Sequence, residues 1–165
     1  MLPVNTSGGG RPAAFLMVTV NARAQSELGL TTVPAIDVVR LRLHAGLWPI
    51  YARTKHRAKM ARGCRLMFYV AGTGSLAQHI VAEGKIAEIQ TDLRPADIVD
   101  QGLVGPKAIC FIRLSDVREF SPPINLPRHR EAMPLFQNSG SHWGVKLMGG
   151  CVALVEKDLE ALNLA

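Results

Sequence analysis

The sequence has no acidic residue over 38–82, although the whole chain contains 13 Asp or Glu and 19 Lys or Arg. Within this gap, the segment 40–65 holds eight Lys or Arg, two His, one Trp and one Tyr. Such a cluster attracts polyanions by releasing counterions from a phosphate backbone, and its aromatic rings offer faces on which bases can stack. A solvated cationic helix is the alternative interpretation, and charge alone does not decide between the two.

Cysteine is also scarce, since Cys64, Cys110 and Cys151 are far apart and form no C-x-x-C pair. This usage argues against a disulfide scaffold and favours a reducing cytoplasm, where each thiol serves as a small core residue. No apolar run reaches the ~18 residues that a membrane span needs, so we expect no membrane partner. The apolar segment 13–20 imitates a secretory signal peptide, but it also predicts a first strand.

Motifs for cofactors, metals and nucleophilic catalysis are missing as well. Residues 72–77 match the dinucleotide fingerprint G-x-G-x-x-G/A, but the next predicted strand follows without the crossover that a Rossmann unit requires. The five His include no pair spaced i,i+4 and none beside a Cys, so we predict no metal site. No G-x-S-x-G sequence is present. We therefore expect no cofactor, and no enzyme class gains support.

The length of 165 residues and the 48% hydrophobic content fit one globular domain. We assign this domain to 14–165 and expect 1–13, which includes three consecutive glycines, to be a disordered leader. A helix is predicted from Pro34 to about Gly46, because Pro49 disfavours helical geometry in the residue before it. Strands are predicted at 14–20, 65–71, 78–89, 107–117 and 145–155.

Shorter elements fill the remaining chain. We expect a surface helix or turn at 53–62, closed by Gly63, and a closing helix at 156–164. The segments 93–106 and 121–141 are expected to be irregular, the second because it contains four prolines. Gly84 indicates a bulge or a close backbone approach within its strand. Because strands and helices do not alternate regularly, the sequence predicts an α+β fold with a barrel-like sheet.

Short motifs follow one another in a particular order at 15–19, 51–63, 66–69, 80–86 and 142–144. Together they cover about 15–162 and resemble the EVE domain family of the PUA-like superfamily, which is related to YTH and ASCH domains. The resemblance implies a PUA-like curved β-barrel-like sheet with flanking helices and a pocket for one nucleobase. Members of the family are regarded as readers of modified bases, chiefly modified cytosines in DNA, often in defence against foreign DNA.

The resemblance also suggests which residues form the pocket. Trp48 is similar to the aromatic residue that related readers place after their first helix, and Asn21 is similar to a polar pocket position. For Trp48 and Trp143 a core position is the alternative, because Trp is highly buried on average. The predicted phosphate contacts are Arg53, Lys55, Arg57 and Lys59. The predicted base pocket consists of Trp48, Asn21, Tyr51, Thr19, Trp143 and His142.

These observations predict a non-enzymatic reader that accommodates a flipped, modified base in an aromatic pocket, with modified cytosine in DNA favoured. Three alternatives stay open: an RNA-binding module of the PUA or YTH type, a nucleotide-processing enzyme, and an interaction module whose basic face binds an acidic protein. The expected partners are nucleic acid, with DNA favoured over RNA, and an effector protein of a defence system.

Overall fold

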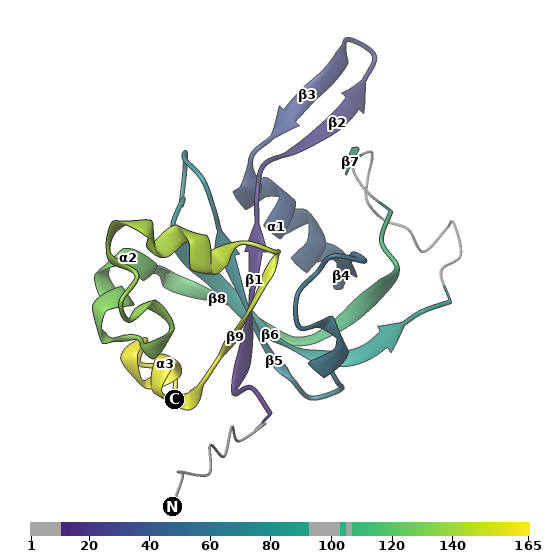
Figure 1. Cartoon of the computed structure of the whole chain (residues 1–165). Coiled ribbons are helices and arrows are strands. Elements are labelled where there is room, and N and C mark those ends of the chain that lie inside the picture. Colours follow the sequence, from purple (N-terminus) through teal and green to yellow (C-terminus); the bar gives the residue numbers. More distant parts are fainter. Residues whose placement is uncertain (1–10, 93–102, 105–106) are drawn as a thin grey trace, which may run out of the picture.

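The computed structural model describes residues 11–92, 103–104 and 107–165. Its main sheet has six strands in the order β4-β8-β6-β5-β1-β9. β1 and β5 are parallel, and the other neighbouring strands are antiparallel. The six strands are β1 (Ala14–Thr19), β4 (Leu47–Ile50), β5 (Arg65–Val70), β6 (His79–Gln90), β8 (Cys110–Asn125) and β9 (Cys151–Leu154). The sheet is curled, and helices flank it (Figure 1).

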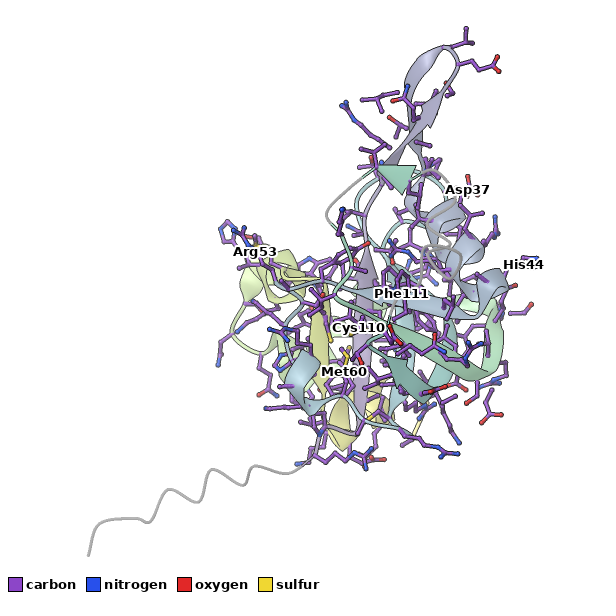
Figure 2. All side chains as sticks on the ribbon, turned by 90° about the vertical axis from the view of Figure 1, so that its right-hand side faces the viewer. Asp37, His44, Arg53, Met60, Cys110 and Phe111 are labelled. Carbon is purple, nitrogen blue, oxygen red and sulfur yellow. The ribbon has the colours of Figure 1, made fainter. Side chains whose placement is uncertain are left out.

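A second, three-stranded sheet is built on a hairpin that projects from the body of the molecule (Figures 1 and 2). It consists of β2 (Ala22–Ser26), β3 (Gly29–Val33) and β7 (Leu103–Val104). Most side chains of β2 and β3 are exposed, and Leu28 at the hairpin turn is 99% exposed. The hairpin leads directly into α1 (Ala35–Ala45), which ends at Gly46 in the left-handed conformation.

Both faces of the main sheet are covered, which explains why β1 reads as a continuous apolar run. Phe15 and Met17 pack in one core cluster, which includes Ile36 of α1. Leu16 packs in the other cluster with Leu126. The second face is covered by α2 (Leu126–His129), α3 (Glu156–Ala161) and the 3₁₀ helices η3 (Arg130–Ala132), η4 (Pro134–Phe136) and η5 (Gly140–Leu147).

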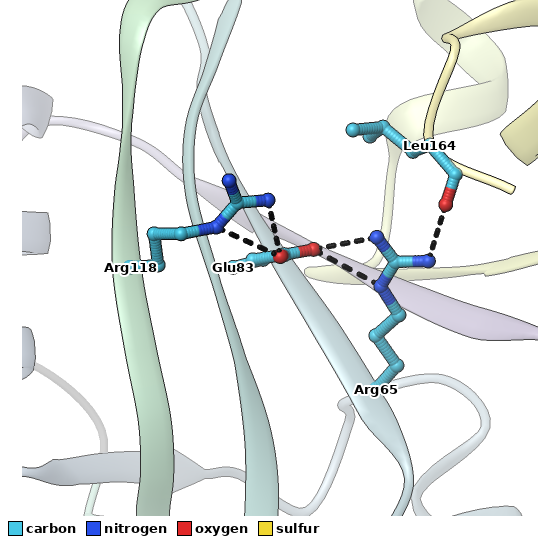
Figure 3. A network of polar contacts seen from close by, with 4 residues as sticks. All are labelled: Arg65, Glu83, Arg118 and Leu164. Atoms are coloured by element: carbon cyan, nitrogen blue, oxygen red, sulfur yellow. Dashed lines mark hydrogen bonds and ion pairs between the residues drawn. The ribbon is translucent and has the colours of Figure 1, made fainter.

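A polar network connects β5, β6 and β8 with one another and with Leu164 near the end of the chain (Figure 3). The Glu83 carboxylate of β6 accepts hydrogen bonds from Arg65 of β5 at 2.6 and 3.0 Å and from Arg118 of β8 at 2.7 and 3.2 Å. Arg65 also donates to the backbone carbonyl of Leu164 at 2.6 Å. Burial alone would raise the pKa of Glu83, but the hydrogen bonds and charges of the two arginines outweigh it, so this pKa is lowered.

Much of the predicted secondary structure is confirmed. The strands at 14–20, 65–71 and 78–89 match β1, β5 and β6, and the helix after Pro34 and the closing helix match α1 and α3. The segment 53–62 forms turns around η1 (Arg57–Lys59). At Gly84 the register between β6 and β8 shifts, and a Cβ atom there would lie 3.4 Å from the Ser115 carbonyl oxygen. The α+β fold class with a curved sheet is therefore confirmed.

Two predictions for the second half of the chain are wrong. The strand predicted at 145–155 is only Cys151–Leu154, because 140–147 form η5 and glycines with positive φ precede the strand. β8 begins at Cys110 and continues to Asn125, so 121–125 are not irregular. Pro122 and Pro123 fit this strand because they lie where the register between β6 and β8 shifts.

Four strands escape prediction from local patterns: β2, β3, β4 and β7, the last of which lies within the segment 93–106, where the prediction of irregular structure throughout is wrong. The hairpin β2–β3 projects into solvent, so it lacks the apolar alternation that marks a half-buried strand. β4 contains Pro49, which is tolerated because β4 is an edge strand. The predicted leader 1–13 and the irregular segment 93–106 lie mostly outside the described residues, but Ala13 already donates a hydrogen bond to Leu154. No described helix has the length and apolar character of a membrane span.

Candidate functional site

Two cavities meet at the end of β1. The smaller, here called the β1 cavity, has a volume of about 310 Å³ and is lined by 18–22, Arg42 of α1 and Tyr51, among others. The larger, here called the Trp143 groove, has a volume of about 590 Å³ and is lined by Gln78, Trp143 and neighbouring residues. Val18, Val20 and Gly150 belong to both linings, so the cavities adjoin.

The topology of the sheet explains why space opens at this point. β1 and β5 run in parallel and end together at the pair Thr19 and Val70. Parallel neighbouring strands cannot be joined by a tight turn, so the segments that follow β1 and β5 leave the sheet by different routes. β1 continues into the β2–β3 hairpin, whereas β5 continues into the loop that starts at Gly72. The carboxyl ends of parallel strands that diverge in this way are frequent ligand sites.

Thr19 provides the most informative polar group of the β1 cavity. Thr19 is only 2% exposed, and its Oγ1 has no hydrogen-bond partner among the described residues. A buried hydroxyl without a partner costs about 1 to 3 kcal/mol, and buried polar side chains are therefore nearly always paired. Thr19 belongs to the cavity lining but its oxygen is covered, so a ligand supplies the missing hydrogen bond if the lining shifts to admit it.

Asn21 contributes a donor to the same cavity. Its Oδ1 accepts a hydrogen bond from the backbone N–H of Ala35 at 2.8 Å, which satisfies one of the first N–H groups of α1. Since that N–H can only donate, the orientation of the Asn21 amide is fixed, and its Nδ2 is the group left for other partners. Within the described part of the chain, Nδ2 has no hydrogen-bond partner.

Arg42 and Tyr51 form the other side of the β1 cavity. Arg42 Nη2 donates to the Tyr51 hydroxyl at 3.3 Å, and its guanidinium lies 5.0 Å from the centre of the Trp48 ring. The backbone N–H of Tyr51 donates to Thr54 Oγ1 at 3.0 Å, which holds the start of the segment 51–63. Tyr51 is half-buried, and it is the aromatic side chain that lines this cavity.

Trp48 lies in the core. It is 3% exposed, and its ring packs on Phe68 with the ring centres 4.5 Å apart. Phe68 and the Arg42 guanidinium lie against the ring, so no base can stack on it in this arrangement. The structure thus agrees with the core alternative for Trp48. Its ring contacts Arg42, which lines the β1 cavity.

Trp143 and His142 lie on η5, away from the β1 cavity. Trp143 is half-buried and lines the Trp143 groove, with its edge against Phe136 and the Arg130 guanidinium 5.6 Å from its ring centre. His142 is exposed and lines neither cavity. The six predicted pocket residues are therefore divided: Thr19, Asn21 and Tyr51 line one cavity, Trp143 lines the other, Trp48 is in the core and His142 is on the surface.

The basic loop 51–63 brings positive charge to these cavities. The backbone N–H of Lys55 donates to the Gly149 carbonyl at 3.2 Å, and the Lys55 side chain lies so close to Gly149 that a Cβ there would be 2.6 Å from Lys55 Cδ. Gly149 lines the Trp143 groove, so the loop is fixed beside it. Arg53 projects at the periphery in Figure 2. The four predicted phosphate contacts are all exposed: Arg53, Lys55, Arg57 and Lys59.

Burial shifts the pKa of three titratable groups near the cavities towards their uncharged forms. Burial, together with the charges of Lys59 and Lys55, lowers the pKa of His56 in the basic loop. Burial raises the pKa of Tyr69, which lines the Trp143 groove, to about 12. Burial also raises the pKa of the Cys151 thiol to about 12, so this thiol is unreactive in its core position, as the sequence predicts. Among the described residues, no cluster of His, Cys, Asp or Glu can hold a metal ion.

Sequence reasoning missed Arg42, Gln78 and the glycines that line the Trp143 groove. Arg42 is one of many cations in its segment, and only the fold shows that it faces the cavity. For the glycines a signal does exist, because Gly149 and Gly150 interrupt an otherwise apolar run without any role in a strand. Such a pair indicates a turn with positive φ, which the structure has at both positions.

The fold has counterparts among solved structures. The N-terminal domain of McrB from Staphylothermus marinus matches with a TM-score of 0.53 at 11% identity, over 93% of this chain and 94% of that one. Protein PSPTO5229 from Pseudomonas syringae matches with a TM-score of 0.52 at 14% identity, over 92% of this chain and 97% of that one. No protein-family model and no curated protein sequence matches the chain. Together with the curled sheet, these matches show a PUA-like fold.

Proposed function

We propose that the protein is a non-enzymatic reader of modified bases in nucleic acid, comparable to the EVE domains it resembles. A flipped base enters the β1 cavity, and modified cytosine in DNA is the favoured ligand. The observation that carries the proposal is the buried hydroxyl of Thr19, a residue of the cavity lining, which has no hydrogen-bond partner among the described residues. A base edge offers the donors and acceptors that this hydroxyl lacks.

The dimensions and lining of the β1 cavity suit a single base. Its volume of about 310 Å³ is at the lower end of the range for small-molecule sites. Val18 and Val20 supply apolar contact, and the ring of Tyr51 supplies a face for stacking. The amide of Asn21 can donate to an acceptor atom of a pyrimidine edge, and the guanidinium of Arg42 adds positive charge to the cavity wall.

The charge distribution suits a polyanion. The described linings of both cavities include no Asp or Glu, and the basic loop reaches them at Tyr51 and at Lys55, which lies against Gly149. The exposed cations of this loop can contact phosphates on either side of a captured base, which positions the strand without reading its sequence. The formal net charge of +6 acts in the same direction. The resemblance to EVE domains further implies an effector of a defence system as a protein partner.

A binding screen tests the proposal. DNA and RNA oligonucleotides of one sequence, each with cytosine, 5-methylcytosine or 5-hydroxymethylcytosine at a single position, are titrated by fluorescence anisotropy at fixed salt. We expect a preference for a modified DNA strand over its unmodified counterpart. Equal affinity for all members of the set would refute base reading, and a preference for modified RNA would assign the cavity to the RNA alternative.

Thr19→Val sharpens this screen because it removes the hydroxyl and keeps the shape. We expect it to weaken binding of the preferred strand by about 1 kcal/mol, since a hydrogen bond to the base is lost. The free energy of unfolding should stay equal or rise, because a buried polar group without a partner is removed. Thr32→Val on the exposed strand β3 is the matched control and should change neither quantity.

A further inference from the structure

The Trp143 groove shares a wall with the β1 cavity. Val18, Val20 and Gly150 line both, and Val20 is 65% exposed between them. A strand that places one base in the β1 cavity can therefore continue past Val20 into the groove. The groove is larger than the β1 cavity, at about 590 against about 310 Å³. One captured base leaves this volume unfilled.

Glycines keep the groove open. Gly72, Gly144 and Gly150 line it, and a Cβ atom added to any of them would meet no atom of the described residues within 4 Å beyond its chain neighbours and, at a helical position, the backbone of its own helix. Gly72 and Gly150 have positive φ, so their backbone conformation already favours glycine. Gly144 has no positive φ, so neither packing nor backbone conformation requires glycine there. Its missing side chain leaves open space in the groove that a ligand can occupy.

The side chains that line the groove suit a nucleotide, that is, a base attached to a phosphate. The Trp143 ring and the apolar side chains of Leu147 and Met148 provide contact area. Gln78 and Ser141 provide polar groups at its wall. The carbon atoms of the Lys55 side chain lie against Gly149 of the groove lining, and this exposed cation can supply charge for a phosphate at the entrance.

We infer that the Trp143 groove binds the nucleotide next to the captured base, so that the protein recognises a two-nucleotide unit. This inference rests on the proposed function of the β1 cavity. Val20 separates the two bases and prevents them from stacking on each other. The protein therefore requires a strand that is single or locally opened, and its affinity depends on a base at the neighbouring position as well as on the modification.

The test compares intact strands with strands that lack the neighbouring base. Single-stranded DNA carrying one 5-methylcytosine is used with all bases present, or with an abasic site at the position 5′ or 3′ to it. We expect one of the two abasic sites to weaken binding by the wild-type protein at least about fivefold, because a stacked base is lost. The same strands with unmodified cytosine report the preference for the modified base separately.

Gly144→Leu fills the groove without a clash at its Cβ position. We expect this variant to bind the intact strand as weakly as the wild type binds the abasic strand, and to show no further loss with the abasic strand. Gly144→Ala should give an intermediate effect. Val145→Leu is the matched control, because it places the same side chain one residue along η5, at a position that is 61% exposed and outside the groove lining. Thermal unfolding verifies that each variant is folded.

The outcomes separate the inference from the proposed function. If the 5-methylcytosine preference is present but neither abasic site weakens binding, the groove inference is wrong and base reading stands. A folded Gly144→Leu variant that binds every strand as the wild type does also overturns the inference. If the preference is absent while the Gly144-dependent effect of the abasic site persists, the groove is supported and the β1 cavity is not the reader. If neither the preference for 5-methylcytosine nor the effect of the abasic site is observed, both the groove inference and the proposed function are wrong.

Discussion

At the residue scale, burial separates the aromatic side chains near the end of β1 into two kinds. Trp48 is 3% exposed and packed on Phe68, whereas Tyr51 is half-buried in the cavity wall. Both residues lie in the acid-free segment and suit base stacking equally well by residue type. The tertiary structure therefore predicts different consequences for their removal.

Trp48→Ala should act on stability. The truncation leaves a cavity in the core beside Phe68, so we expect the free energy of unfolding to fall by about 3 to 5 kcal/mol. Chemical denaturation followed by fluorescence and circular dichroism measures this change. A variant that unfolds at the wild-type denaturant concentration would show that the ring is not part of the core.

Tyr51→Ala should act on binding. Its ring is expected to stack on the captured base, so its loss should weaken binding of the preferred oligonucleotide by about 1 to 3 kcal/mol. The change in stability should be smaller than that of Trp48→Ala, because Tyr51 is only half-buried. Anisotropy titration and thermal unfolding of the same preparation separate the two effects. An unchanged preference for the modified base would remove Tyr51 from the site.

At the element scale, the basic loop is an irregular segment whose position depends on a remote strand. Few of its own side chains are buried, and it is attached to the body through the hydrogen bond of Lys55 to Gly149, which lies shortly before β9. The hydrogen bond of Gly63 to Ile86 of β6 and the buried Met60 attach it as well. Its cations can therefore point into solvent while the backbone stays close to both cavities. Such an arrangement favours contacts with phosphates over contacts with base edges.

Replacing Arg53, Lys55 and Lys59 with Ala should weaken binding to all sequences to a similar extent. If each cation contacts one phosphate, the slope of the logarithm of the binding constant against the logarithm of salt concentration should become shallower by about 2 to 3. Arg57 is left in place because its Nε donates to the Ala52 carbonyl at 3.2 Å. Titrations at several salt concentrations measure the slope.

The matched control removes the same amount of charge elsewhere. Lys85, Arg128 and Lys157 are exposed and lie on β6, α2 and α3. Their replacement with Ala should leave the salt slope nearly unchanged. If both triple variants change the slope equally, the binding face is not the basic loop, and net charge alone accounts for the attraction.

At the scale of the whole molecule, the Glu83 network couples stability to pH. The pKa of Glu83 is lowered in the folded state, so its carboxylate stabilises the fold at pH values above the usual Glu pKa of about 4.3. This contribution is lost as the pH falls through the folded-state pKa. Arg118 is largely exposed, so solvent screens part of the interaction.

Glu83→Gln should therefore destabilise the protein by about 1 kcal/mol at pH 7, and the difference from the wild type should shrink towards zero below about pH 4. Urea denaturation over a range of pH values measures the difference. Glu119→Gln on β8 is the control, since Glu119 is exposed. A difference that is constant with pH would mean that the loss comes from packing rather than from charge.

The sequence by itself determines the elements whose patterns are local. β1, β5, β6 and α1 follow from apolar runs and helical spacing, and α3 follows from acids in its first turn, because these signals lie within each element. The concentration of positive charge and the absence of acids over 38–82 are likewise properties of the chain alone. They predict a binding face for polyanions, but they do not place it on the molecule.

Only the tertiary structure decides which of these residues surround a cavity. Trp48 lies in the core because β4 joins the edge of the sheet and carries the ring onto Phe68. The Thr19 hydroxyl, which has no hydrogen-bond partner among the described residues, lies where the parallel strands β1 and β5 end together. Lys55 reaches the groove because its loop lies against Gly149. Each of these facts depends on contacts between segments remote in sequence, and no local pattern encodes such contacts.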